Sequence, residues 1–268
     1  LSGRMLGVRA DITPQTARMD AHSLAEDGLT RLCYAGSTLQ STPQSVGSGR
    51  APIQLGAELY GSNSIEADSE IITLMLSMFE AAGVTRSLTL DIGHIGIYDA
   101  LFSEVGLGPD VEAEIFDALQ RKSTPDIERL ASTLTADMAE KLLILSSLHG
   151  SSDVIGKARA ALGGEAFVSN ALDELETALE QVRLAYPEVD VYIDLTELRG
   201  FRYHTGLVFA VYLEGRGSAI AKGGRYDNIG AVFGRDRPAT GFAIDLKALV
   251  DDAATPQSKD VPVVAPLS

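Results

Sequence analysis

Residues 199–210, Arg-Gly-Phe-Arg-Tyr-His-Thr-Gly-Leu-Val-Phe-Ala, and residues 221–227, Ala-Lys-Gly-Gly-Arg-Tyr-Asp, are the most informative part of this sequence. The first segment places polar and aromatic side chains between two glycine positions and continues into apolar, strand-forming residues. The second is a glycine pair that leads to an arginine, a tyrosine and an aspartate. Taken singly, the first fits a hairpin with a polar solvent face and the second an ordinary glycine turn. Their order along the chain carries more information than either segment.

A third segment, Arg9-Ala-Asp-Ile-Thr-Pro-Gln15, lies near the start of the sequence. Arg9 and Asp11 are two residues apart on an expected strand end, so their side chains share one face. Thr13 is placed to cap a helix that has Pro14 at its first position. A carboxylate beside a capped helix start can hold an ammonium group, while the amides hold an anion. A surface ion pair next to an ordinary cap is the alternative.

The fourth segment, residues 54–61, alternates like a strand. Gln54, Gly56, Glu58 and Tyr60 point to one face, and three apolar side chains point to the other. The polar face is either exposed to water or covered. If it is covered, Glu58 requires a cation from an arginine or from a ligand, because an unpaired buried carboxylate is costly.

The pattern along the rest of the chain predicts an α+β fold. We expect a strand–turn–strand element over residues 1–9, further strands over 54–60, 87–92, 189–195, 201–204, 207–213 and 218–221, and helices over 66–82, most of 98–186 and about 242–250. The order strands, helices, strands favours an antiparallel sheet that carries a helical insertion. We predict a core of residues 1–100 and 187–252, an insertion over 101–186, and a linker or the start of a further strand over 253–268. The element at residues 1–9 also predicts that residues upstream of it are missing.

Composition narrows the class of protein. The chain has 268 residues, 45% of them hydrophobic, and a net charge of −15, which is typical of a folded domain that does not bind nucleic acid. No apolar run is long enough for a membrane span, so we expect a cytoplasmic protein. Cys33 is the only cysteine, and His22, His94, His149 and His204 do not form a metal-ligand pattern. We therefore predict no metal and no cofactor.

Together the four segments resemble the catalytic domain of histidyl-tRNA synthetase, which has a class II aminoacyl-tRNA synthetase fold. The resemblance runs from Leu1 to about Val250. Members of that family carry an Arg-Pro-Glu-Gly-Thr loop where this chain has residues 9–13, and a Gln-x-Gly-x-Glu strand that matches residues 54–58. An Arg-Gly-x-x-Tyr-Tyr-x-Gly motif matches residues 199–206, with His204 at the second tyrosine, and Gly-Gly-Arg-Tyr-Asp matches residues 223–227 without a change. The resemblance implies a mixed, mostly antiparallel sheet flanked by helices.

The resemblance also implies a histidine-binding pocket. In the family, the carboxylates at the positions of Asp11 and Glu58 attract the ammonium group of the amino acid. The equivalents of Gln54 and Tyr203 help to hold the substrate, and the equivalent of Tyr226 lies beside the imidazole. The arginine at position 199 is the family's catalytic group for adenylate formation, and here its guanidinium fork suits a ligand carboxylate. The expected pocket residues are Asp11, Thr13, Gln54, Glu58, Arg199, Tyr203 and Tyr226.

The sequence departs from the family where the ATP-binding arginines belong. Gln40 stands where the first arginine is expected, and Ala248 stands at the position of the second. Asp245 replaces a glycine and adds negative charge, and Lys247 lies about 100° away from Ala248 on a helix. Because the loss of one transition-state cation costs on the order of 10²–10³ in rate, we expect no useful adenylation of histidine. Arg50 is a less suitable phosphate ligand, because it belongs to a glycine- and serine-rich loop.

A histidine pocket without an ATP clamp is similar to one known family, the regulatory subunit of short-form ATP phosphoribosyltransferase. Residues 9–15 and 91–98 resemble that family more than true synthetases. The resemblance implies a non-catalytic subunit that dimerises, joins the short catalytic subunit in a hetero-octamer, and mediates feedback inhibition by histidine in the first step of histidine biosynthesis. The alternatives are a histidyl-tRNA synthetase, which ATP–pyrophosphate exchange would reveal, and a stand-alone interaction module, which would not bind free histidine.

Overall fold

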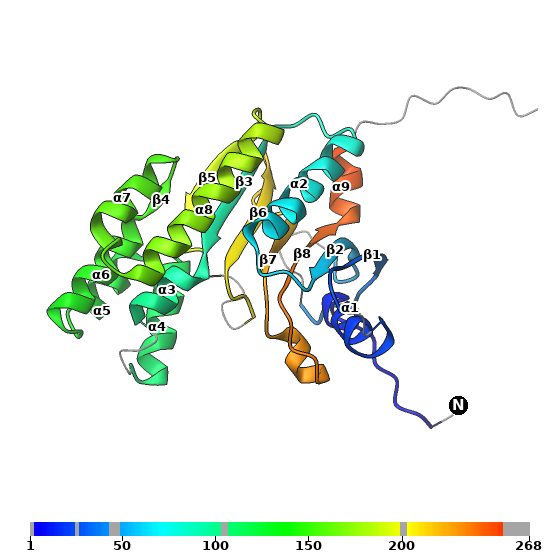
Figure 1. The fold of residues 1–268 in the computed structure, drawn as a ribbon, viewed down its shortest axis with the longest axis horizontal. Helices are drawn as coiled ribbons and strands as arrows, with labels where there is room; N and C mark the ends of the chain where they lie inside the picture. Colours follow the sequence, from blue (N-terminus) through cyan, green and yellow to red (C-terminus); the bar gives the residue numbers. More distant parts are fainter. Residues whose placement is uncertain (1–2, 25–26, 43–48, 103–106, 199–202, 254–268) are drawn as a thin grey trace, which may run out of the picture.

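The structure is a computed structural model that describes residues 3–24, 27–42, 49–102, 107–198 and 203–253. Its centre is a mixed sheet of eight strands (Figure 1). In chain order these are β1 (Thr30–Ser37), β2 (Ile53–Tyr60), β3 (Leu88–His94), β4 (His149–Gly150), β5 (Asp190–Asp194), β6 (Leu207–Leu213), β7 (Ala221–Arg225) and β8 (Ala239–Asp245). The spatial order is β1-β2-β8-β7-β6-β3-β5-β4.

Every pair of neighbouring strands is antiparallel except β3 and β5, which are parallel. A parallel pair needs a long crossover connection, and here the chain between these two strands supplies a series of helices. The prediction of a mixed, mostly antiparallel sheet flanked by helices is therefore confirmed.

Helices cover the sheet and extend past its end. They are α1 (Thr13–Met19), α2 (Ile65–Ala81), α3 (Ile95–Phe102), α4 (Pro109–Gln120), α5 (Thr124–Ala131), α6 (Ala136–Ser147), α7 (Asp153–Leu162), α8 (Ala166–Ala185) and α9 (Leu246–Asp252). A short π-helix, η1 (Asp20–Leu24), follows α1, and a 3₁₀-helix, η3 (Ile229–Phe233), precedes β8.

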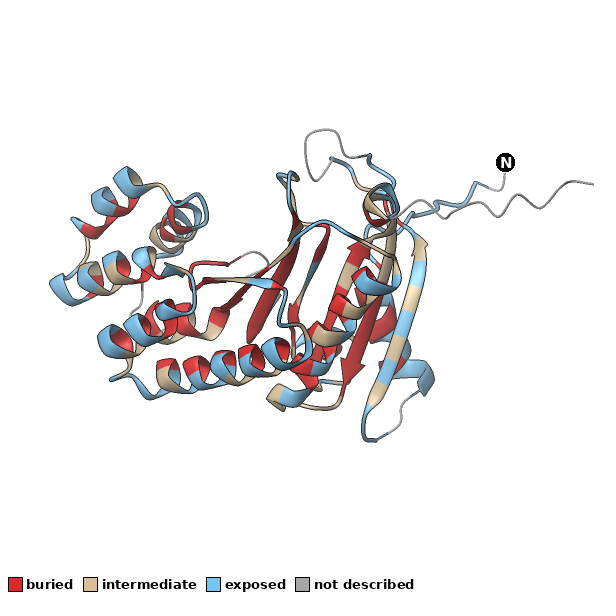
Figure 2. Ribbon diagram, turned by 90° about the horizontal axis from the view of Figure 1, so that it is seen from above, coloured by how far each residue is buried: buried red, intermediate tan, exposed pale blue. Residues whose placement is uncertain are grey.

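The main core lies between the sheet and the two longest helices. Figures 1 and 2 show α2 and α8 side by side along one face of the sheet, where α2 contacts β2, β7 and β8, and α8 contacts β3. Ile72, Met75 and Phe79 of α2 are fully buried there, as the helical spacing of these residues predicts. Burial of apolar side chains of this size contributes roughly 1.5–3 kcal/mol each.

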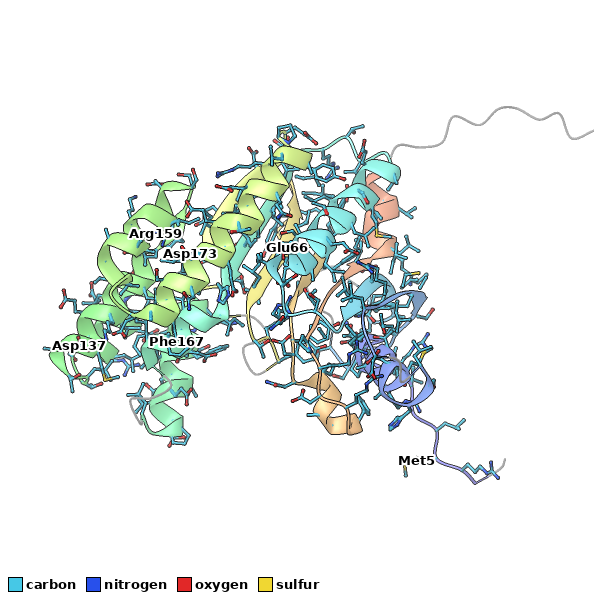
Figure 3. All side chains as sticks on the ribbon, viewed as in Figure 1. Met5, Glu66, Asp137, Arg159, Phe167 and Asp173 are labelled. Carbon is cyan, nitrogen blue, oxygen red and sulfur yellow. The ribbon has the colours of Figure 1, made fainter. Side chains whose placement is uncertain are left out.

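The predicted insertion consists of helices, but α8 does not stand apart from the sheet. It packs on α2, α3, α7 and β3, and Arg159 on α7 pairs with Asp173 on α8 at 2.8 Å (Figure 3). The two-residue strand β4 joins the insertion to the sheet through β5. The division into a core and an insertion at residues 101 and 186 stays a prediction.

The element predicted at the start of the chain is wrong, and the one predicted at its end lies almost entirely outside the described residues. Residues 3–9 form no strand, and Met5, Leu6 and Val8 are exposed on a segment that extends away from the body of the fold (Figure 3). None of the described strand pairs includes a residue of this segment. The predicted linker or strand over 253–268 lies outside the described residues except for Ala253, which bridges to Val84.

Two boundaries differ for the same physical reason, and a further predicted strand is only partly described. Residues 242–245, predicted as the start of a helix, are the end of β8, because their backbone pairs with β2 on one side and β7 on the other. Strand β7 begins at Ala221 rather than at residue 218. Of the predicted strand 201–204, only residues 203 and 204 are described, and they are not in a strand. Pairing with neighbouring strands, and not local propensity, sets these boundaries.

Candidate functional site

The polar face of β2 is internal, which decides between the two interpretations that the sequence leaves open. Ala57 and Leu59 belong to the core that includes α2, so Glu58 points to the opposite face of the sheet. Glu58 is nevertheless only 1% exposed. On the neighbouring strand β8, Gly241 lies directly across from it. A methyl group at Gly241 would collide with the Glu58 carboxylate, so only glycine leaves room for this side chain.

Three hydroxyl groups donate hydrogen bonds to the Glu58 carboxylate. The Thr13 hydroxyl donates to Oε1 at 2.8 Å and the Tyr34 hydroxyl to the same oxygen at 3.2 Å, while the Tyr226 hydroxyl donates to Oε2. Among the described residues, no lysine or arginine forms an ion pair with Glu58. Burial therefore raises the pKa of Glu58 to about 8, although the three hydroxyl groups act in the opposite direction.

Thr13 does not cap α1, contrary to the prediction. The residue that precedes the helix is Ile12, and no side chain caps it; Thr13 is the first helical residue, and Pro14 follows at the second position. The Thr13 amide donates to Oδ1 of Asp11 at 3.2 Å, so Asp11 takes an acceptor role near the helix start. The Thr13 hydroxyl is thereby left to donate to Glu58.

Gln54 holds the Asp11 segment against β2. Its side-chain oxygen accepts the Ile12 amide at 2.9 Å, and its side-chain nitrogen donates to Oδ1 of Asp11 at 3.0 Å. Asp11 is exposed. A buried carboxylate at Glu58 and an exposed one at Asp11 thus lie near one another, and the charge of Asp11 acts on Glu58. Such a pair attracts a cationic group.

An aromatic wall forms the other side of the site. The rings of Tyr203 and Tyr226 are stacked, with centroids 5.0 Å apart and an angle of 22° between their planes, and the ring of His204 meets Tyr203 edge-on at 5.2 Å. Burial raises the pKa of both tyrosines above the usual value, so both hydroxyl groups stay neutral. A wall of this kind suits a flat ligand ring.

Arg225, next to Tyr226 in the chain, holds the backbone of this aromatic wall in place. Its guanidinium forms a buried ion pair with Asp68 of α2 at 2.7 Å and donates to the carbonyl oxygens of Ser62 and Ser64. The backbone next to it is fixed as well, since the Thr205 amide donates to the Arg225 carbonyl at 2.8 Å. Residues 203–205 and 225–226 are therefore held side by side.

These groups line one cavity of about 280 Å³. Six of the predicted pocket residues contribute to its wall: Asp11, Thr13, Gln54, Glu58, Tyr203 and Tyr226. The seventh, Arg199, lies outside the described residues. The structure thus brings together residues that are up to 215 positions apart, but it does not by itself identify the ligand.

Gln40 and Ala248, the positions where ATP-binding arginines are expected, line the same cavity together with Asp245. Lys247 does not replace the missing charge, because its ammonium group donates to the Ala51 carbonyl at 2.6 Å and does not line the cavity. Arg216 does line it, but its guanidinium is paired with Asp252 at 2.5 Å. The positions of the two expected arginines therefore supply no positive charge to the cavity, although Lys222 also lines it.

Sequence reasoning missed three residues of the site: Tyr34, Gly241 and Arg225. Tyr34 lies on β1, which was not predicted, because residues 30–37 show no clear alternation of apolar and polar side chains in the sequence. Their alternation between half-buried and exposed positions becomes visible only in the structure. Gly241 and Arg225 were visible as parts of motifs. Their roles depend on contacts with Glu58 and Asp68, which no local pattern encodes.

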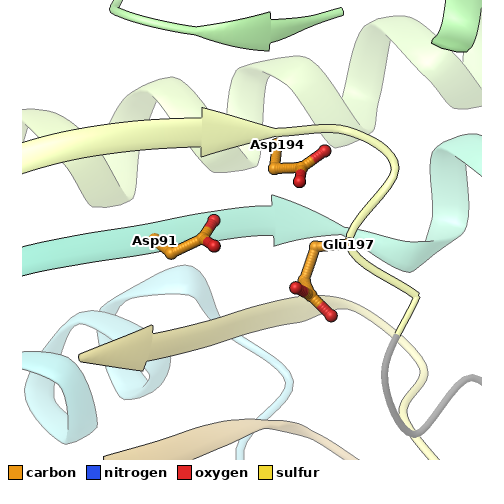
Figure 4. Close-up of side chains that lie close together, drawn as sticks. All are labelled: Asp91, Asp194 and Glu197. Carbon is orange, nitrogen blue, oxygen red and sulfur yellow. The ribbon is translucent and has the colours of Figure 1, made fainter. Parts of the chain in front are cut away.

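A second group of carboxylates lies away from the cavity. Asp91, Asp194 and Glu197 have oxygens within 4.8 Å of one another and are all buried (Figure 4). Both oxygens of Asp194 are engaged by the protein: Lys122 pairs with Oδ2 at 2.6 Å, and the amide and hydroxyl of Thr196 donate to Oδ1. None of the three lines the cavity. We assign them a structural role at the ends of β3 and β5.

His94 is held as a structural residue, as the sequence suggested. Its Nδ1 accepts the Gly96 amide at 3.1 Å, so Nε2 carries the proton and donates to Glu174 at 3.0 Å.

Among the described residues, no helix is long and apolar enough to cross a membrane.

Comparisons with known proteins agree with this geometry. The sequence model of a family described as histidyl-tRNA synthetase matches residues 1–249. An ATP phosphoribosyltransferase regulatory subunit of Pseudomonas fluorescens is 53% identical, over 93% of this chain and 63% of its own length. One from Marinobacter nauticus is 48% identical, over 99% of this chain and 68% of its own length. The chain thus spans about two thirds of the length of these curated relatives.

Among solved structures, one from Bacillus halodurans described as an ATP phosphoribosyltransferase regulatory subunit/histidyl-tRNA synthetase superposes with a TM-score of 0.80. It is 29% identical and covers 92% of this chain and 65% of that one.

Proposed function

The chain belongs to the family of ATP phosphoribosyltransferase regulatory subunits, which share the histidyl-tRNA synthetase fold, and from this we propose that it is a non-catalytic, histidine-sensing regulatory subunit. In this proposal it binds the short catalytic subunit of ATP phosphoribosyltransferase in the cytoplasm. It is needed there for full activity in the first step of histidine biosynthesis and for inhibition by the end product.

One observation supports this proposal above all others. A single cavity combines a carboxylate and aromatic pocket at Glu58 and Tyr226 with uncharged side chains at Gln40 and Ala248. A pocket for an amino acid is useful to a sensor even when the amino acid is not activated. An adenylating enzyme, in contrast, requires cations at the phosphates.

The pocket has the chemistry that free histidine requires. Glu58 and Asp11 offer negative charge for the ammonium group, and the stacked rings of Tyr203 and Tyr226 offer a flat surface for the imidazole. The arginine at position 199 is proposed to hold the carboxylate, by resemblance to the synthetase motif.

The proposed assembly contains a dimer of this chain and, by the same resemblance, a hetero-octamer with the catalytic subunit. The acidic surface of the helical insertion is one candidate for the contact. Its helices α4 and α8 carry many exposed carboxylates, such as Asp173 and Glu176.

The decisive experiment mixes the purified chain with the short catalytic subunit and measures phosphoribosyl transfer. We expect activity to rise when this chain is added and to fall when histidine is then supplied. An unchanged rate with both additions would remove the regulatory assignment.

The alternative is a histidine-adenylating enzyme, and the matched assay is ATP–pyrophosphate exchange with histidine. We expect no exchange above background. Robust exchange would favour a synthetase, whatever the result of the first assay.

A further inference from the structure

The described side chains that contact Glu58 include no cation, although Lys222 of β7 and Arg216 line the same cavity and Arg216 is paired with Asp252. Each of the elements around Glu58 supplies a hydroxyl, a carboxylate, a ring or only backbone. They are Thr13 of α1, Tyr34 of β1, Tyr60 of β2, Gly241 of β8, Tyr226 after β7, Asp11 before α1, and Tyr203 and His204 of the cavity wall.

The charge that acts on the ionisation of Glu58 is that of Asp11, and it opposes ionisation. Tyr34, Tyr60, Tyr203 and Tyr226 all have pKa values raised by burial and remain neutral. A buried carboxylate that accepts only hydroxyl hydrogen bonds is best accommodated in its protonated form. This agrees with the pKa of about 8 for Glu58.

The hydroxyl groups around Glu58 can form hydrogen bonds both with its protonated acid and with its ionised carboxylate. A hydroxyl group can both donate and accept a hydrogen bond. The hydroxyl oxygens of Tyr34 and Thr13 also lie 3.2 Å from each other. Each hydroxyl can therefore rotate either to donate to the Glu58 carboxylate or to accept the proton of the carboxylic acid. An amide or ammonium donor could not turn in this way. The pocket thus tolerates the neutral acid when it is empty and the carboxylate when a cation is present.

We propose that the amino acid enters this pocket in exchange for the Glu58 proton. The carboxylic acid loses its proton to solvent, and the ammonium group of the ligand takes the place of that proton against the resulting carboxylate. One O–H bond breaks, the proton passes to solvent, and no covalent bond forms to the ligand. The new carboxylate–ammonium pair is neutral, as the carboxylic acid was, and the ligand's own carboxylate adds one negative charge to the pocket. The inference rests on the proposed function, because it takes free histidine as the ligand.

The exchange makes the site sensitive to pH as well as to histidine. Below the pKa of the empty pocket, each ligand must displace a proton, so affinity rises as pH rises. Between pH 7 and pH 8 the dissociation constant should fall about fivefold, if one proton is exchanged and the pKa is near 8. The imidazole of free histidine is already mostly neutral in this interval, so its own titration contributes little.

The test is calorimetry of histidine binding at pH 7.2 in phosphate and in Tris buffer, which differ in ionisation enthalpy. We expect the difference in measured enthalpy to correspond to release of about 0.9 proton per ligand, the fraction of Glu58 that is protonated at this pH when its pKa is near 8. Imidazole-4-propionate, which lacks the ammonium group, serves as the matched ligand and should release none.

Two variants test whether Glu58 is the residue that releases the proton when histidine binds. Glu58→Gln should bind histidine more weakly, with no proton release and no change of affinity between pH 7 and pH 8. As the control, His22→Gln replaces a histidine that does not line the cavity and should retain the release. The number of protons that the wild-type protein releases per ligand is measured independently of whether either variant folds.

The outcomes separate the two proposals. Histidine binding with equal enthalpy in both buffers would overturn the exchange and leave the histidine pocket in place; this is the result expected if Glu58 passes its proton to the imidazole instead. Absence of any histidine binding would overturn the pocket and the exchange together. Release that persists in Glu58→Gln would overturn the assignment to Glu58.

Discussion

Replacing Arg225 by alanine removes the cation from the most deeply buried ion pair described in this fold. The Arg225 and Asp68 side chains are 7% and 3% exposed, and two guanidinium nitrogens reach the same carboxylate oxygen, at 2.7 and 3.0 Å. After the replacement, Asp68 is a buried carboxylate without a cation. Removing one partner of a buried pair costs about 3–5 kcal/mol, because the remaining charge is uncompensated.

The matched control is Arg121→Ala. Arg121 pairs with Asp117 at the same 2.7 Å, but the two side chains are 55% and 61% exposed. Exposed pairs contribute about 0–1 kcal/mol, because water and salt screen them. The two substitutions remove the same chemical group at the same ion-pair distance, so their difference reports the effect of burial together with the hydrogen bonds of Arg225 to Ser62 and Ser64.

The assay is urea denaturation, together with the midpoint temperature of thermal unfolding, for both variants at pH 7.5. At roughly 2–4 °C per kcal/mol for a chain of this size, Arg225→Ala should lower the midpoint by about 6–20 °C. Arg121→Ala should lower it by no more than about 4 °C. Arg225→Lys should be intermediate, since lysine restores the charge but not the fork of donors.

Acid should reduce the effect of Arg225→Ala. Burial already raises the pKa of Asp68, and loss of the guanidinium raises it further, so the carboxyl of the variant is neutral at a higher pH than that of the wild type. The loss of unfolding free energy caused by Arg225→Ala should therefore become smaller as pH falls towards 5. A loss of stability no larger than that of Arg121→Ala at pH 7.5 would refute the reasoning.

Three further predictions concern the cavity. Gly241→Ala should abolish histidine binding in calorimetry and lower the unfolding midpoint, because the new methyl group meets the Glu58 carboxylate. The control, Gly156→Ala, has free space in a helix and should stabilise the fold by about 0.4–1 kcal/mol; equal effects of the two substitutions would contradict the prediction. The pKa of Glu58 is raised in the folded state, so the native protein holds a proton that the unfolded chain releases, and stability should fall as pH rises from about 4.5 to about 8. Glu58→Gln should flatten that part of a thermal-unfolding pH series, and an unchanged slope would exclude Glu58 as its source. Gln40→Arg alone should not restore ATP–pyrophosphate exchange, since Ala248 and Asp245 remain; exchange above background would show that one cation suffices.

The fold class followed from the order of strand-like and helical segments and from motifs that the chain shares with a known family. The helix at residues 65–81 and the strands at 53–60 and 207–213 were predictable, because their apolar residues repeat with the period of each structure. The segment 242–245 was assigned to a helix by its local pattern and is a strand, because β2 and β7 hydrogen-bond to it from both sides.

For the site, the sequence supplied the residue types and their order. Asp11, Gln54, Glu58, Tyr203 and Tyr226 line one cavity, as the motifs predicted. The role of Thr13 was wrong, because a helix cap is inferred from neighbours in sequence, whereas its hydroxyl bonds to a residue 45 positions away.

The sequence by itself determined which kinds of group are present: an acidic residue on a strand, tyrosines in the glycine motifs, and no arginine at positions 40 and 248. Only the tertiary structure decided the state of those groups. Whether Glu58 is charged depends on how deeply it is buried and on which side chains from three different segments of the chain reach it. Desolvation and contact are properties of packed surfaces, and residues that are far apart in the chain create them only when the sheet has assembled.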